Sequence, residues 1–214
     1  MLKKILNVFK NKFYNRIYNV IKTGNDIKSW IKNDRIGSPP QKYRHKIIKL
    51  YAQTYKISVL IETGTYLGKT IEAVKKKFEK IYSIELNDTL YNRAKEKFSK
   101  DKFITIIGGD SSKELPKILN KIDKPCLFWL DAHYSGGITS RGDLETPILL
   151  ELQCILNHSN QDHIILIDDA NHFTGKKEYP SISELKEMIK EFPEKVLIIK
   201  DNVIRIHKKL INFL

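Results

Sequence analysis

The chain has 214 residues, of which 41% are hydrophobic and 29% are charged. This composition is typical of a globular protein and excludes a largely disordered chain, and the length suffices for one core with an appendage. Residues 1–50 contain ten Lys, three Arg and two Asp, so they carry +11 of the net charge of +13. Both cysteines lie in apolar segments without C-x-x-C spacing, which excludes a zinc ribbon and a disulfide framework and favours a reducing compartment.

Apolar residues recur at three- and four-residue steps through residues 1–24, and most basic residues fall outside this stripe. The pattern predicts an amphipathic helix that ends near Thr23-Gly24. Basic residues interrupt it too often for a signal-peptide core or a membrane span. Three roles remain open: docking on the main domain or a second subunit, as in a homodimer, lying on an anionic membrane surface, or contacting nucleic acid.

The paired prolines of Ser38-Pro39-Pro40 stop any helix and mark a linker. We therefore divide the chain into a basic helical extension with its linker, residues 1–40, and a main domain, residues 41–214. The main domain should open with a helix over 41–55, after which strands and helices alternate. The expected strands are 57–62, 80–85, 103–108, 125–130, 163–168, 195–200 and 203–207, and the expected helices lie near 69–79, 88–99, 112–121, 146–157 and 181–191.

This alternation, with nearly continuous apolar strands, predicts an α/β fold whose mostly parallel sheet is covered by helices on both faces. Asp201-Asn202 is a two-residue turn between the last two strands, so the sheet should finish in an antiparallel hairpin. Ligands of such open sheets bind beyond the carboxyl ends of the strands.

The first strand ends in an acid and a glycine-containing turn, Glu62-Thr63-Gly64-Thr65-Tyr66-Leu67-Gly68, and a helix follows at once. Glycines allow close approach to a ligand, and the helix start offers unpaired N–H groups. Glu85 ends the second strand, where a carboxylate suits both hydroxyls of a ribose. Asp110-Ser111 follows the third strand and could accept from an adenine amino group, although each such acid could also simply cap a helix. Glu62 would repel a pyrophosphate and attract a sulfonium, which favours S-adenosylmethionine over NAD.

On these features, residues 45–207 resemble the class I S-adenosylmethionine-dependent methyltransferases. The resemblance implies a Rossmann-like fold with seven strands in the order 3-2-1-4-5-7-6 and an antiparallel last strand. The cofactor contacts expected from it are Glu62, Thr63, Gly64, Thr65, Tyr66, Gly68, Glu85, Asp110, Ser111 and Asp131.

Asp131 follows the fourth strand, and the pair Asp168-Asp169 follows the fifth. Neighbouring parallel strands would bring these carboxylates together, and a hard cation such as Mg²⁺ would relieve their repulsion. The arrangement is similar to that of metal-dependent O-methyltransferases, including the macrocin O-methyltransferase-like group acting on sugars, and to methyltransferase-domain proteins of bacterial glycan pathways. The resemblance implies that Asp131, Asp168 and Asp169 hold Mg²⁺; the alternative for the pair is a helix-cap or loop role.

His133 is the candidate general base, because imidazole titrates near neutral pH, and Asp131 is the second choice. A loop histidine that binds backbone is the alternative for His133. The candidate substrate contacts are Tyr134, Arg141, which could bind an anionic group, and His172, which lies close to Asp169 in the sequence. Residues 135–145 form a polar loop suited to a lid.

The sequence thus predicts an S-adenosylmethionine-dependent, Mg²⁺-assisted O-methyltransferase. Its expected acceptor is a hydroxyl of a small sugar or surface-glycan precursor, as in polysaccharide biosynthesis. One alternative is an RNA-directed methyltransferase or nucleic-acid-binding protein that uses the basic N-terminus, although no dedicated RNA-binding motif is present. Another is a non-catalytic scaffold at a membrane. We expect a cytoplasmic protein, which could contact the inner face of the membrane through residues 1–24.

Overall fold

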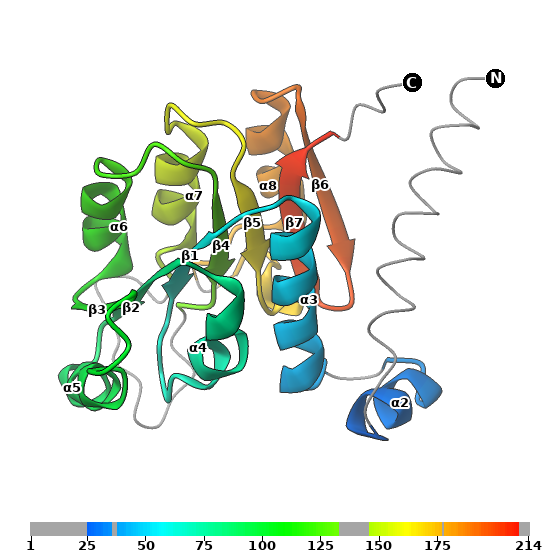
Figure 1. The fold of residues 1–214 in the computed structure, drawn as a ribbon. Helices are drawn as coiled ribbons and strands as arrows, with labels where there is room; N and C mark the ends of the chain where they lie inside the picture. Colours follow the sequence, from blue (N-terminus) through cyan, green and yellow to red (C-terminus); the bar gives the residue numbers. More distant parts are fainter. Residues whose placement is uncertain (1–24, 36–37, 133–145, 177, 210–214) are drawn as a thin grey trace.

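The computed structural model describes residues 25–35, 38–132, 146–176 and 178–209 (Figure 1). Seven strands form one sheet in the order β3-β2-β1-β4-β5-β7-β6. Strands β1 to β5 pair in parallel, and β7 is antiparallel to both of its neighbours. The strands are β1 (Val59–Thr63), β2 (Lys80–Glu85), β3 (Ile104–Gly108), β4 (Cys126–Leu130), β5 (Ile164–Ile167), β6 (Lys195–Lys200) and β7 (Val203–Lys208). The predicted fold class and strand order are therefore confirmed.

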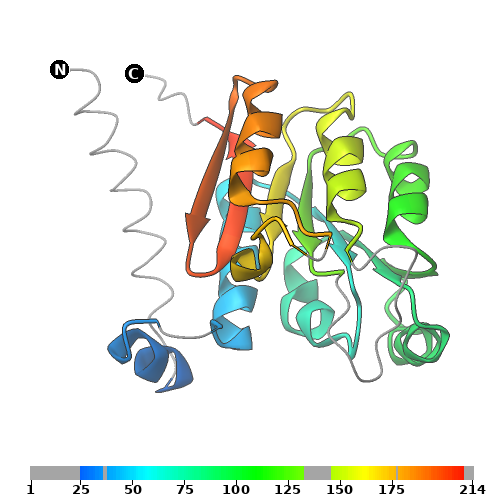
Figure 2. The same cartoon turned by 180° about the vertical axis from the view of Figure 1, so that it is seen from behind.

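Helices cover both faces of the sheet. On one face lie α3 (Gln41–Thr54), α4 (Lys69–Val74) and α5 (Asp88–Lys97) (Figure 1). On the other lie α6 (Ser111–Leu119), α7 (Ile148–Leu156) and α8 (Ile182–Lys190) (Figure 2). Two short 3₁₀ turns, Lys75–Lys77 and Ala170–His172, follow α4 and β5. The predicted elements are thus present, with most ends shifted by one or two residues and the helix expected over 69–79 shortened.

One helix, α2 (Asn25–Lys32), was not predicted from the sequence. Its buried residues Ile27 and Trp30 join the core formed with α3, where the Trp30 and Tyr43 rings lie 5.0 Å apart. Eight residues hold too few apolar positions to reveal a helical period, so the sequence alone does not indicate a separate helix here. The helix predicted over residues 1–24 lies outside the described residues, and the domain division at residue 40 stays a prediction.

The central strands β1, β4 and β5 are buried along their whole length. Each has a strand on both sides and helices on both faces, which explains their continuous apolar sequences. Strands β1, β4 and β5 all point to the lower edge in Figure 1, from which α3 also starts. We call this the carboxyl edge of the sheet.

The turn between β6 and β7 is tied to α3. Asp201 and Asn202 both have positive φ, 52° and 57°, as a two-residue hairpin turn of type I′ requires. The Asp201 carboxylate accepts a hydrogen bond from the Tyr43 hydroxyl and forms an ion pair with Arg35 at 3.1 Å. The predicted hairpin is confirmed, and its turn anchors the start of α3 at the carboxyl edge.

None of the described helices is both long enough and apolar enough to cross a bilayer.

Replacing a central core side chain tests the packing of the sheet. Leu166 in β5 is fully buried, so Leu166→Ala should lower the free energy of unfolding by about 2–5 kcal/mol, measured by urea denaturation. The matched change Leu150→Ala, at a side chain 46% exposed on α7, should cost less than about 0.5 kcal/mol. Equal losses from both variants would contradict this account of the core.

Candidate functional site

The loop between β1 and α4 lies against the ends of both neighbouring strands. The amides of Gly64 and Thr65 donate to the Ile84 carbonyl of β2 at 3.0 and 3.3 Å. Gly64 has a φ of +87°, and a Cβ atom there would lie 2.6 Å from the Asp131 carbonyl oxygen beyond β4. Glycine is therefore required at this position, and the loop lies directly against the backbone of Asp131, one of the three aspartates predicted to hold a metal ion.

Glu85 at the end of β2 holds this loop in place. Its Oε2 accepts from the Tyr66 amide at 2.7 Å, and its Oε1 accepts from the Asn87 amide at 3.0 Å. Tyr66 has a φ of 48°, a left-handed conformation that a non-glycine residue needs support to keep. Glu85 thus shapes the loop in addition to its predicted contact with a ribose.

Glu62 lies beneath the loop and is 1% exposed. Its Oε2 accepts a hydrogen bond from the Ser83 hydroxyl at 2.6 Å. Burial raises the pKa of Glu62 to about 8, against hydrogen bonds from Ser83 and Thr70. The sequence suggests a charged Glu62, whereas its burial favours the protonated form near neutral pH until a cation lies nearby.

Asp110 and Ser111 open helix α6 after β3. The Asp110 Oδ1 accepts from the amide and the hydroxyl of Ser112, at 2.9 and 2.7 Å, so Asp110 is the N-cap of the helix. The capping role considered from the sequence is present, and the predicted adenine contact remains a prediction.

Glu151 on α7 is an acid that sequence reasoning missed. It is 1% exposed, and burial raises its pKa to about 7, opposed by the nearby hydroxyls of Ser111 and Thr63. The sequence does contain a signal, because Glu151 occupies the apolar face of its helix with Ile148, Leu152 and Ile155. An acid on a buried helix face needs an explanation, and here it lies beside the residues assigned to the cofactor.

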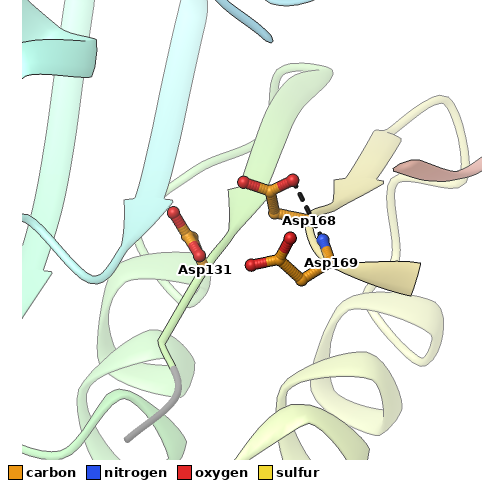
Figure 3. A group of neighbouring side chains, drawn as sticks. All are labelled: Asp131, Asp168 and Asp169. Atoms are coloured by element: carbon orange, nitrogen blue, oxygen red, sulfur yellow. Dashed lines mark hydrogen bonds between the residues drawn. The ribbon is translucent and has the colours of Figure 1, made fainter. Parts of the chain in front are cut away.

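Asp131, Asp168 and Asp169 form an acidic cluster at the carboxyl edge (Figure 3). Each offers one carboxylate oxygen, and these oxygens lie within 4.8 Å of one another. The Asp131 amide donates to the Thr63 carbonyl and the Asp168 amide to the Leu130 carbonyl, at 3.0 and 3.1 Å. These bonds continue the sheet beyond its strands, which explains why the three aspartates meet as expected.

Arg44, in the first turn of α3, contacts this cluster although it lies 125 residues before Asp169 in the sequence. Its Nε lies 3.0 Å from the Asp168 Oδ2, and its Nη2 lies 3.0 Å from the Asp169 Oδ1. Asn202 in the hairpin turn also donates to the Asp169 Oδ1, at 3.0 Å. Neither contact was predicted, because nothing local in the sequence links these segments.

The aspartates are held in an environment that disfavours their charge. Burial raises the pKa of Asp131 well above its usual value, and the neighbouring Asp168 raises it further. Burial also raises the pKa of Asp168, while Arg44 lowers it. Three hard carboxylate donors with one guanidinium carry a formal charge of about −2, so the donor set fits a divalent ion such as Mg²⁺.

A pocket lies beside the acidic cluster, on the side of α7 and the segment after β5. Its lining residues are Leu130, Asp131, Ala132, Thr146, Ile148, Glu151, Ile167, Asp168, Asp169, Phe173 and Tyr179. Polar and apolar side chains thus line a small cavity next to the acidic cluster.

The predicted substrate contacts are only partly described. His172 is exposed and packs edge-on against Tyr179, with ring centroids 5.6 Å apart, while its amide donates to the Asp169 carbonyl. Its substrate role stays a prediction. His133, Tyr134 and Arg141 lie outside the described residues, as does the loop of residues 135–145.

No protein-family model matches the sequence, and a search of curated proteins finds no relative. Solved structures do share the fold. An O-methyltransferase of Bacillus cereus in complex with S-adenosylhomocysteine is 13% identical, with a TM-score of 0.59 over 87% of this chain and 92% of that one. An O-methyltransferase of Streptomyces achromogenes involved in tomaymycin synthesis, in complex with S-adenosylmethionine, is 11% identical. Its TM-score is 0.58 over 86% of this chain and 87% of that one. A methyltransferase of Podospora anserina bound to S-adenosylhomocysteine is 15% identical, with a TM-score of 0.57 over 92% of this chain and 96% of that one. The chain therefore has the Rossmann-like methyltransferase fold.

The buried Glu151 should make stability depend on pH. Its folded pKa of about 7 lies above the ordinary value of 4.5, so its contribution is complete below about pH 4.5 and is lost as the pH rises to 7. Between pH 5 and 8, the unfolding free energy of the wild type should fall by about 2–3 kcal/mol more than that of Glu151→Gln. Urea denaturation at several pH values measures this. The exposed control Glu79→Gln should follow the wild type, and parallel curves for the wild type and Glu151→Gln would contradict the prediction.

Proposed function

We propose that the chain is an S-adenosylmethionine-dependent methyltransferase that transfers a methyl group to a hydroxyl oxygen. The observation that carries the proposal is the contact between the acidic cluster and the loop between β1 and α4, residues 64–68, which we call the glycine loop. Gly64 packs so closely on Asp131 that a Cβ atom would lie 2.6 Å from its carbonyl. A donor bound on the loop and an acceptor bound at the cluster would therefore be neighbours, as group transfer requires.

The donor would bind across the ends of β1, β2 and β3. Glu85 is placed for a ribose, and Asp110 with Ser111 lies on the side assigned to the adenine. The buried carboxyl group of Glu62 supports a cationic donor, because a sulfonium or ammonium group nearby would stabilise its ionised form. The bound cofactors of the structurally similar methyltransferases are consistent with this choice.

The acceptor would bind at Asp131, Asp168 and Asp169, which would also hold Mg²⁺. The ion would lower the pKa of an acceptor hydroxyl and orient it. Transfer forms a bond between the acceptor oxygen and the methyl carbon and breaks the bond from that carbon to sulfur, so the sulfonium becomes a thioether. The hydroxyl proton would pass to His133 or, as the second choice, to Asp131.

For the acceptor, we propose a small molecule with neighbouring hydroxyls, such as a sugar or glycan precursor. The support is the meeting of the three aspartates at one edge of the sheet, in the pattern by which they resemble those of sugar O-methyltransferases. An RNA acceptor is the competing outcome of the test below.

Cofactor binding can be tested by calorimetry with S-adenosylhomocysteine. Glu85→Ala removes the predicted ribose contact and releases the Tyr66 amide, so it should weaken binding at least about tenfold, a loss of roughly 1.4 kcal/mol. Glu96→Ala, at an exposed position on α5, is the matched control and should bind as the wild type does. A wild type that does not bind S-adenosylhomocysteine would refute the cofactor assignment, and unchanged binding by Glu85→Ala would refute the role of that residue.

The reaction can be tested with labelled S-adenosylmethionine and a panel of nucleotide sugars, free sugars, catechols and RNA. We expect label in a small diol or sugar, loss of transfer in chelator and recovery on adding Mg²⁺. Asp168→Asn should reduce transfer about 100-fold or more, since the cluster loses a charged oxygen donor. Label in RNA alone would favour the competing acceptor, and full transfer in chelator would exclude the metal.

A further inference from the structure

The Arg44 guanidinium forms ion pairs with two of the three aspartates of the acidic cluster. Arg44 lies in the first turn of α3, where its amide donates to the carbonyl of the N-cap residue Pro40 at 3.3 Å. Its guanidinium spans the two neighbouring aspartates, with 3.0 Å from Nε to the Asp168 Oδ2 and 3.0 Å from Nη2 to the Asp169 Oδ1. The Asp168 side chain in this pair is fully buried, and that of Arg44 is 18% exposed.

The pairing uses the oxygens that a metal ion would need. The Asp168 Oδ1 accepts from the Asp169 amide at 2.9 Å, and its Oδ2 faces Arg44 (Figure 3 shows the first of these bonds). The Asp169 Oδ1 is shared by Arg44 and the Asn202 side chain. A divalent ion that binds Asp168 must therefore share Oδ2 with the guanidinium or share Oδ1 with the Asp169 amide.

We propose that Arg44 is the resident counter-cation of the acidic cluster and competes with a divalent ion for Asp168 and Asp169. The metal half of this proposal rests on the proposed function. In the absence of metal, Arg44 offsets one of three carboxylate charges and keeps the pair in place. When a divalent ion enters, two cations face each other within a few ångströms in a partly buried site, where their repulsion is weakly screened.

The sign of the effect separates competition from a merely structural role. If Arg44 only supported the aspartates, its removal would loosen them and weaken metal binding. If Arg44 competes, its removal lifts the repulsion and strengthens metal binding. The second effect should be larger, because charge repulsion at this range outweighs the cost of ordering two short side chains.

The test uses the full chain and Mn²⁺ as the probe, with binding followed by electron paramagnetic resonance. Arg44→Met should bind Mn²⁺ at least about tenfold more tightly than the wild type. Arg44→Lys keeps the charge but loses the planar fork, and its affinity should fall between these two. Arg93→Met, the same change at an exposed position on α5, should match the wild type. An Arg44→Met affinity equal to or below that of the wild type would overturn the competition.

A second measurement without metal tests the pairing itself. In chelator, Arg44→Met should lower the midpoint of thermal unfolding by about 6 °C or more, because it leaves a buried carboxylate without its cation. In the double variant with Asp168→Asn, the loss should be clearly smaller than the sum of the two single losses. Additive losses would overturn the role as counter-cation.

The two proposals can fail separately. If neither the wild type nor Arg44→Met binds Mn²⁺ at millimolar concentration, competition is wrong and so is the metal assistance of the proposed reaction. Calorimetry with S-adenosylhomocysteine then decides the rest: binding retained by both proteins leaves the cofactor assignment in place.

Discussion

The parallel register of β1, β4 and β5 is the constraint on which the site depends. Because Asp131 bonds to Thr63 and Asp168 to Leu130, the ladder continues one residue past the strands. The glycine loop and all three aspartates therefore end at one edge, although about a hundred residues separate the first from the last. A register shift of one residue in β4 would turn Asp131 to the other face of the sheet. The fold thus fixes the distance between the loop after β1 and the acidic cluster.

This edge concentrates acids that the protein interior disfavours. Burial raises the pKa of Glu62, Asp131, Glu151 and Asp168, and among the described residues Arg44 is the cation in ion-pair contact with the cluster. Groups held in this way reduce stability near neutral pH and are typical of functional sites, where a ligand offsets the cost. Two cationic ligands would suit the arrangement: a sulfonium near Glu62 and a divalent ion at the cluster. One physical property of the edge thus favours both halves of the proposed reaction.

Strand–helix alternation was sufficient for the parallel sheet, and the resemblance to class I methyltransferases implied the strand order. The convergence of the aspartates could be predicted because they directly follow neighbouring strands. The sequence could not place Arg44 or Asn202, whose contacts with Asp169 join segments more than thirty residues apart. It also could not reveal the raised pKa of Glu62, because that shift depends on a burial that only the folded chain produces. Glu151 lies between these cases. Its place on the apolar face of α7 was a signal that the prediction missed, and its neighbours Ser111 and Thr63 come from other elements.

The missed contacts share one origin. The Tyr43 hydroxyl binds Asp201, Arg44 binds Asp168 and Asp169, and Asn202 binds Asp169. The first turn of α3, the hairpin turn and the end of β5 therefore form one hydrogen-bonded unit. Helix α2 packs on the same turn of α3 through Trp30. A displacement of α2 or of the start of α3 would therefore move Tyr43 and Arg44, and through Arg44 the acidic cluster, without involving the loop after β1. The N-terminal part of the described chain thus contacts the acidic cluster and not the loop after β1, so it lies on the side of the site that we propose for the metal and the acceptor.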